Sequence, residues 1–254
     1  MSYTREALGT VAGMYLSAEA VVLAPALAVA LAATALWGRV SRPRLAAAAL
    51  GVVLVFAAFV TRLEPLANHT FLWAHLLQNV VLAEWAPALL VLAVPPRFAA
   101  RVTGRGPLRP LVALPLWLAT YYVWHLPWIY DTALRHPHSL LHLEHLTYLL
   151  AGACVWWPVV HGGYSAGGKA AYLFAAFVLA SPLGLLLALI PRAIYPFYVH
   201  APRTWGPAPL ADQQIAGVTM AAEEALVFFG AFTVYLLRFL RDEQAAGLAA
   251  APHR

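Results

Sequence analysis

The stretch FLWAHLLQNVVLAEWAPALLVLAVP, residues 71–95, is apolar except for His75, Gln78, Asn79 and Glu84. A membrane-spanning helix requires about 20 mainly apolar residues, and this stretch is long enough. Its apolar residues do not alternate with polar ones, as they do in the strands of a membrane barrel. Because only helices and closed barrels span a bilayer, residues 71–95 are expected to form a transmembrane helix.

Six further stretches have a similar length and apolar character: residues 18–38, 45–62, 110–130, 139–160, 170–191 and 214–238. The chain of 254 residues is 62% hydrophobic and 11% charged, with a mean hydropathy of +0.71. Soluble domains contain about 25% charged residues, so most of this surface is expected to face lipid. We therefore predict an all-α, polytopic integral membrane protein, in which residues 1–254 form a single domain, a bundle of seven transmembrane helices.

The basic residues are distributed unevenly over the two ends of this predicted bundle. Five lie at one end, and eleven lie at the other: Arg39, Arg42, Arg44, Arg97, Arg101, Arg105, Arg109, Lys169, Arg238, Arg241 and Arg254. By the positive-inside rule the end with eleven is cytoplasmic, so the N-terminus is outside and the C-terminus inside. The same rule accounts for the pI of about 9.6, so the lipid bilayer is an expected partner and nucleic acid is not.

Eight of the ten histidines lie at the predicted outer end: His69, His75, His125, His136, His138, His142, His145 and His200. His142 and His145 are three residues apart and share a helix face. His75 begins the third span and His125 ends the fourth, so three helices bring imidazoles to a similar depth. This arrangement favours a shared metal site of His75, His125, His142 and His145, although imidazole alone does not select the metal.

The alternative is that these histidines lie at the headgroup level, hydrogen-bonded or hydrated. His69, His136, His138 and His200 are expected to be solvated loop residues. The single cysteine, Cys154, excludes an internal disulfide and a cysteine-based metal motif.

Several other polar residues fall within or beside the predicted spans. Intramembrane carboxylates are energetically costly and typically functional, but each could also be a protonated group hydrogen-bonded between helices. Asp212 is expected to cap the last helix, and Met220 either packs or helps to hold Cu(I). The candidate residues of this additional polar set are Gln78, Asn79, Glu84, Glu144, Asp212, Gln213, Met220, Glu223 and Glu224.

Four segments together resemble the multi-span CtaG-type assembly factors of caa(3)-type cytochrome c oxidase. They are HLLQN with APALLVLAVPP (75–79 and 86–96), WHLPWIYDTAL (124–134), HLEHLTYLLAG with WWP (142–158), and PRAIYPFYVHAPRTWGPAPLADQQIAGVTM (191–220). The resemblance implies a non-enzymatic plasma-membrane protein that helps to build a heme-copper oxidase by supplying copper to an oxidase subunit. The family's polar positions fall on His75, Gln78, His125, Asp131, His142, Glu144, His145, Asp212, Gln213, Gln214 and Met220.

Two segments depart from the family's usual pattern. The family usually has HMxQH in the third span, whereas this chain has Leu76 and Asn79 in place of the methionine and the second histidine. The family's usual Trp-x-Pro-Gly-Gly after the last methionine is replaced by AAEEA, residues 221–225.

The leading hypothesis is therefore an assembly factor that holds or delivers copper at an outer-leaflet histidine site. A first alternative is an ion, proton or metal transporter that uses the intramembrane glutamates. A second is a glutamate-type intramembrane protease, because FLWAH (71–75), HLLQN (75–79) and Glu223–Glu224 resemble that family's FxxxH, HxxxN and EExxxR elements. Here the glutamate pair comes last along the chain, and Phe228 occupies the position that requires arginine.

Overall fold

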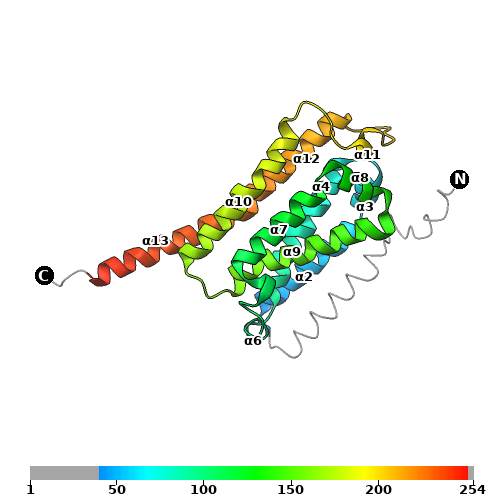
Figure 1. Ribbon diagram of the computed structural model, residues 1–254. Helices are drawn as coiled ribbons and strands as arrows, with labels where there is room; N and C mark the ends of the chain where they lie inside the picture. The colour runs from blue at the N-terminus through cyan, green and yellow to red at the C-terminus, as the bar shows by residue number, and fades with distance from the viewer. Residues whose placement is uncertain (1–39, 251–254) are drawn as a thin grey trace.

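The computed structural model describes residues 40–250 (Figure 1). Every regular element in this part of the chain is helical, which confirms the predicted all-α class. The expected span at 18–38 lies outside the described residues.

The helices follow one another with short connections. In chain order they are α2 (Arg42–Val60), α3 (Leu63–His69), α4 (Leu72–Val80), η1 (Val81–Trp85), α5 (Ala86–Ala93), α6 (Pro96–Ala99), η2 (Gly106–Leu108), α7 (Pro110–Trp124), α8 (Pro127–Arg135), η3 (Pro137–Leu141), α9 (His142–His161), α10 (Ala166–Leu189), α11 (Pro196–Val199), α12 (Pro209–Glu224), η4 (Ala225–Phe229) and α13 (Gly230–Ala250). Of these, η2 is a 3₁₀ helix, and η1, η3 and η4 are π-helical turns.

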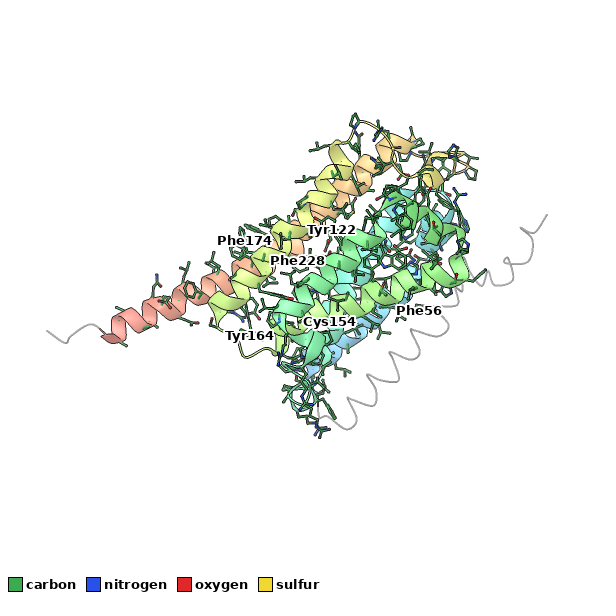
Figure 2. All side chains as sticks on the ribbon, in the orientation of Figure 1. Phe56, Tyr122, Cys154, Tyr164, Phe174 and Phe228 are labelled. Carbon is green, nitrogen blue, oxygen red and sulfur yellow. The ribbon has the colours of Figure 1, made fainter. Side chains whose placement is uncertain are left out.

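Within the described residues, four helices are long and apolar enough to cross a membrane: Arg42–Val60, Leu72–Ala93, Ala166–Leu189 and Pro209–Ala249. They correspond to the expected spans at 45–62, 71–95, 170–191 and 214–238. The exposed side chains of these helices are largely apolar, as lipid contact requires; Phe174, for example, is 46% exposed (Figure 2). The expected total of seven spans and the orientation of the termini stay predictions.

The expected span at 110–130 is wrong at its C-terminal end. The apolar helix α7 has 15 residues and ends at Trp124, and a separate helix, α8, begins at Pro127. Proline disfavours a helical conformation at the residue before it, and Leu126 is accordingly extended, with φ −63° and ψ 124°. The break leaves His125 at the end of α7.

The segment α4–η1–α5 lies in the middle of the bundle and contacts α2, α9 and α12. Helices α10, α12 and α13 run along one flank, and α13 extends beyond the others (Figure 1). Gly184 of α10 and Gly217 of α12 meet closely, because a Cβ atom on Gly217 would lie 2.6 Å from the Gly184 carbonyl oxygen. Small residues allow membrane helices this approach, so the glycine pair fixes α10 against α12.

Candidate functional site

A hydrogen-bond chain orients His75, which is fully buried in α4. The Tyr198 hydroxyl donates its hydrogen to the Ala67 carbonyl. The same hydroxyl oxygen lies 2.8 Å from His75 Nδ1 and must therefore accept the Nδ1 hydrogen. The other ring nitrogen, Nε2, consequently faces Glu144, with Oε1 of Glu144 at 3.5 Å.

Glu144 of α9 is also fully buried and is surrounded by nitrogen-bearing side chains. Its Oε1 atom accepts a 2.8 Å hydrogen bond from Asn79 Nδ2. The ionisable groups close enough to interact electrostatically with its carboxylate are the imidazoles of His75 and His145. A carboxylate cannot face an imidazole lone pair favourably, so the space between Glu144 and Nε2 of His75 requires a proton or a metal cation.

Two further predicted ligands lie close to this pair. The ring centroid of His145 is 6.1 Å from that of His75. His125 donates from Nδ1 to the Tyr121 carbonyl at 2.7 Å, and its Nε2 atom has no hydrogen-bond partner among residues 40–250. The Tyr130 ring lies between, with its centroid 5.0 Å from His75 and 5.9 Å from His125. Helices α4 and α9 and the end of α7 therefore bring three of the four predicted histidines together.

The fourth predicted ligand, His142, is partly exposed and lies beside a different histidine. Its ring centroid is 6.3 Å from that of His138. His138 is exposed, as are His69, His136 and His200, in agreement with the predicted exposure. The predicted loop position is wrong for His69, which ends α3, and for His138, which lies in η3. Among residues 40–250, no three His, Cys, Asp or Glu side chains already form a geometry that could hold a metal ion.

Asp212 was predicted to cap its own helix, and this prediction is wrong. Its carboxylate accepts hydrogen bonds from the backbone N–H groups of Leu72 at 2.9 Å and Trp73 at 3.0 Å, which begin α4. Arg203 also donates to it at 2.8 Å. The residue at the N-cap of α12 is Ala208. Asp212 therefore caps the neighbouring helix and fixes the end of α4 from which His75 projects.

Gln78 and Gln213 connect segments of the bundle. Gln78 donates to the Ala58 carbonyl at 3.0 Å and to Glu64 at 2.5 Å. Gln213 accepts from the Ile194 N–H at 2.8 Å and donates to the Arg192 carbonyl at 3.1 Å. These contacts give both glutamines a structural role beside the histidine cluster.

Asp131, another of the family's polar positions, holds the segment that carries Tyr198. Its two carboxylate oxygens accept from the Phe197 N–H at 3.2 and 3.1 Å. Burial raises the pKa of Asp131, and the Phe197 hydrogen bond and the Arg135 charge oppose that rise. The carboxyl group thus positions α11 over His75.

A separate group of three buried carboxyls lies deeper in the bundle. Glu223 accepts from Trp85 Nε1 at 2.8 Å, and its carboxyl lies close enough to that of Glu84 for the two groups to interact. Glu224 accepts from the Tyr121 hydroxyl at 2.6 Å. In the described part of the chain, no Lys or Arg pairs with these carboxyls. Two charged carboxylates this close together would repel each other, so a proton on one of them would stabilise the pair.

Two π-helical turns lie at this carboxyl group. Glu84 is part of η1, and η4 follows directly after Glu224. Single π-helical turns within α-helices are found frequently at functional sites. The turn at η1 fits against Gly152 of α9, where any Cβ atom would overlap the Ala83 carbonyl.

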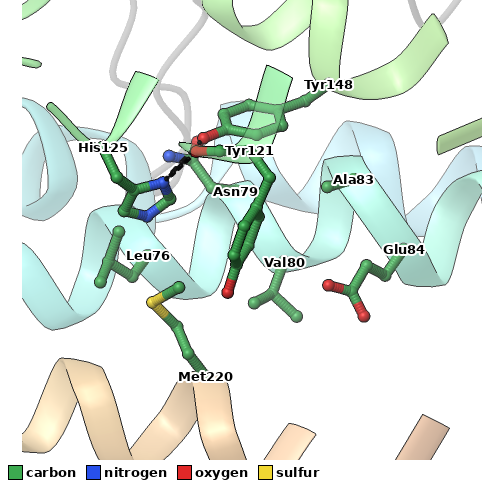
Figure 3. Close-up of a pocket in the computed structure, with 9 residues that line it drawn as sticks. All are labelled: Leu76, Asn79, Val80, Ala83, Glu84, Tyr121, His125, Tyr148 and Met220. Carbon is green, nitrogen blue, oxygen red and sulfur yellow. Dashed lines mark hydrogen bonds between the residues drawn. The ribbon is translucent and has the colours of Figure 1, made fainter. Parts of the chain in front are cut away.

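A small cavity lies between the histidines and the carboxyls (Figure 3). His125 and Met220 are at one end, Glu84 is at the other, and the Tyr121 hydroxyl points between them. Its volume of about 10 Å³ is close to the minimum for a single water molecule. Met220 is therefore a buried wall residue of this cavity, beside the unpartnered nitrogen of His125.

The tyrosines of this site were not predicted from the sequence. Tyr195 and Tyr198 lie in the connection between α10 and α12, yet they are only 1% and 2% exposed. The residue type itself could have indicated this role, because a tyrosine combines a large apolar ring with a hydroxyl that requires a hydrogen-bond partner when buried. Tyr121 and Tyr130 belong to the same unpredicted group.

Comparison with known proteins places the chain in one family. No curated protein and no solved structure matches it. A family model, described as cytochrome c oxidase caa3 assembly factor (Caa3_CtaG), matches residues 26–242. Because that match covers most of the sequence, the chain belongs to the caa3-type cytochrome c oxidase assembly factor family.

Proposed function

We propose that this assembly factor binds copper between His75 and Glu144 and passes it to a cytochrome c oxidase subunit. The supporting observation is the 3.5 Å separation of His75 Nε2 from Glu144 Oε1, where a proton or a metal cation is required. With bonds of about 2.0–2.2 Å, a tetrahedral metal holds two ligand atoms about 3.4 Å apart. The observed separation fits such an ion. Copper is the cargo of this site.

The remaining ligands come from the neighbouring imidazoles. The His145 ring, with its centroid 6.1 Å from that of His75, is close enough to supply a further ligand, and imidazole binds copper readily. His125 lies beyond the Tyr130 ring, so this ring would have to move before His125 could join. The partly exposed His142, with His138 beside it, provides a first contact for an incoming ion. A site that is incomplete before the metal arrives suits a protein that must also release it. In the proposed orientation, the cluster lies beneath the outer face of the plasma membrane.

The test is copper bound per purified monomer. His75→Ala and His145→Ala should each lower the copper content strongly, whereas His69→Ala, an exposed histidine at the same end, should not. Membranes containing the two site variants should also hold less active oxidase at equal amounts of the assembly factor. Unchanged copper binding in both site variants would contradict the proposal.

The three buried carboxyls support a second candidate function, proton transfer across part of the bundle. Intramembrane carboxyls typically mark ion or proton pathways. Glu84 and Glu223 lie close enough together for one proton to pass between them, and the cavity between Glu84 and His125 has room for about one water molecule. Proton flux in reconstituted vesicles that falls in Glu223→Gln but not in His145→Ala would support this function and separate it from copper binding.

The geometry of the described residues does not favour the protease alternative. His75 and Asn79 contact Glu144, whereas Glu223 contacts Trp85. The histidine and asparagine of the predicted motifs therefore lie with a different glutamate from the pair that the protease mechanism requires.

A further inference from the structure

A second cavity, of about 520 Å³, lies at the opposite end of the bundle from His75, His125 and His145. It is formed where α7 and α10 begin and α9 ends. Pro110, Leu111 and Val159 contribute apolar surface, and Arg109 and Lys169 contribute positive charge. A cavity of this size can hold part of a lipid molecule.

The cations at this cavity are held in place by the protein. Arg109 donates from Nε to the Gly104 carbonyl at 2.8 Å. Lys169 Nζ lies 5.5 Å from the Tyr235 ring centroid, and the Arg238 guanidinium lies 5.1 Å from the same centroid. Lys169 therefore experiences the like charge of Arg238. An anion bound at the cavity would relieve this repulsion.

The surface beside the cavity is apolar and open to the surroundings. Leu111 is 91% exposed, Tyr164 is 46% exposed and Val112 is 45% exposed. Figure 2 shows Tyr164 at the end of the bundle where α10 begins. This combination of a fixed positive rim and an exposed apolar wall matches the two parts of an anionic lipid, its phosphate and its acyl chains.

We propose that this cavity binds an anionic phospholipid. The phosphate lies between Arg109 and Lys169, and an acyl chain follows Leu111 and Val112 along the outside of α7. Basic pockets between transmembrane helices are known sites for anionic headgroups, and this end also carries most of the basic residues of the chain. The inference is independent of copper binding.

The test uses the full-length protein in detergent and measures the binding of phosphatidylglycerol, phosphatidylcholine and inorganic phosphate by native mass spectrometry. Phosphatidylglycerol should bind best. Replacing Arg109 or Lys169 with glutamine should weaken its binding by about fivefold for each charge removed. Arg105→Gln, at the same end but outside the cavity, should have little effect. Leu111→Trp, at an exposed position that tolerates a larger side chain, should obstruct the acyl chain and reduce binding.

Three outcomes would overturn the proposal. Equal binding of phosphatidylcholine would show that charge does not select the lipid. Phosphate alone competing fully with the phospholipid would indicate a simple anion site. An equal loss of binding in Arg105→Gln would indicate attraction to the general surface charge.

Discussion

At the scale of single residues, position 79 is the most informative difference between this chain and its family. Asn79 donates to Glu144 Oε1, so its side chain lies within the histidine cluster. The family pattern usually has histidine here. Asn79 satisfies the carboxylate, but its amide nitrogen cannot coordinate a metal, so this chain has one fewer imidazole beside Glu144.

Asn79→His should therefore increase copper affinity. We expect a change of at least about tenfold, or about 1.4 kcal/mol, because the new imidazole adds a ligand beside His75 and Glu144. Isothermal titration calorimetry of the purified protein with copper measures this change in affinity. Asn68→His is the matched control, because Asn68 bonds to Glu64. Equal affinity in Asn79→His and the unaltered protein would argue against copper at this position.

At the scale of helices, a carboxylate on one helix holds the first turn of another. Asp212 on α12 caps α4, and Asp131 on α8 holds the first turn of α11. Both contacts join segments that are distant in the chain. The first fixes the helix that carries His75, and the second fixes the helix that carries Tyr198, the hydrogen-bond partner of His75. The position of His75 therefore depends on α12 as well as on its own helix.

Asp212→Ala should destabilise the protein by about 2–4 kcal/mol. The change removes the cap from two N–H groups of α4 and leaves the mostly buried Arg203 without its carboxylate. Thermal unfolding in detergent measures the loss, and copper binding should fall with it because α4 loses its fixed end. Asp242→Ala, on the exposed part of α13, should leave the unfolding temperature unchanged.

At the scale of the whole molecule, hydropathy predicts the helices better than it predicts their contacts. Residues 71–95 and 170–191 were located correctly because a membrane helix is defined by the average polarity of about 20 residues. Such an average contains no information on the helix break at Leu126, the π-helical turns or the burial of the Tyr198 side chain. Those features depend on contacts between distant segments, as does the Asp212 cap.

The candidate site was predicted in part for the same reason. Periodicity places His145 on the inner face of its helix, and helix ends place His75 and His125 at a similar depth. The sequence pattern could not distinguish His142 from His145, because the two residues are only about one helical turn apart. That one turn decides whether the side chain reaches the buried histidines or the surface. Glu84, Glu223 and Glu224 were recognised in the sequence as candidate residues. That Glu84 lies beside Glu223 became clear only from the fold.

Helix packing across the bundle depends on the Gly184–Gly217 contact. Gly217→Val should destabilise the protein by about 1–3 kcal/mol or more, because the added side chain would separate α10 from α12. Gly247→Ala is the control, since no atom of the described residues lies within 4 Å of its added Cβ atom. Thermal unfolding of both variants distinguishes a packing effect from a general loss of helix flexibility, which would affect both.

The length of the last helix has a consequence for how the protein meets its surroundings. Pro209–Ala249 contains 41 residues, and at 1.5 Å per residue it measures about 60 Å. A bilayer with its headgroups is only about 40–45 Å thick. If the helix lies along the membrane normal, roughly 15–20 Å of it extends beyond the headgroups. The C-terminal part, which bears Arg241, Asp242 and Glu243, is exposed and polar, so it suits water better than lipid.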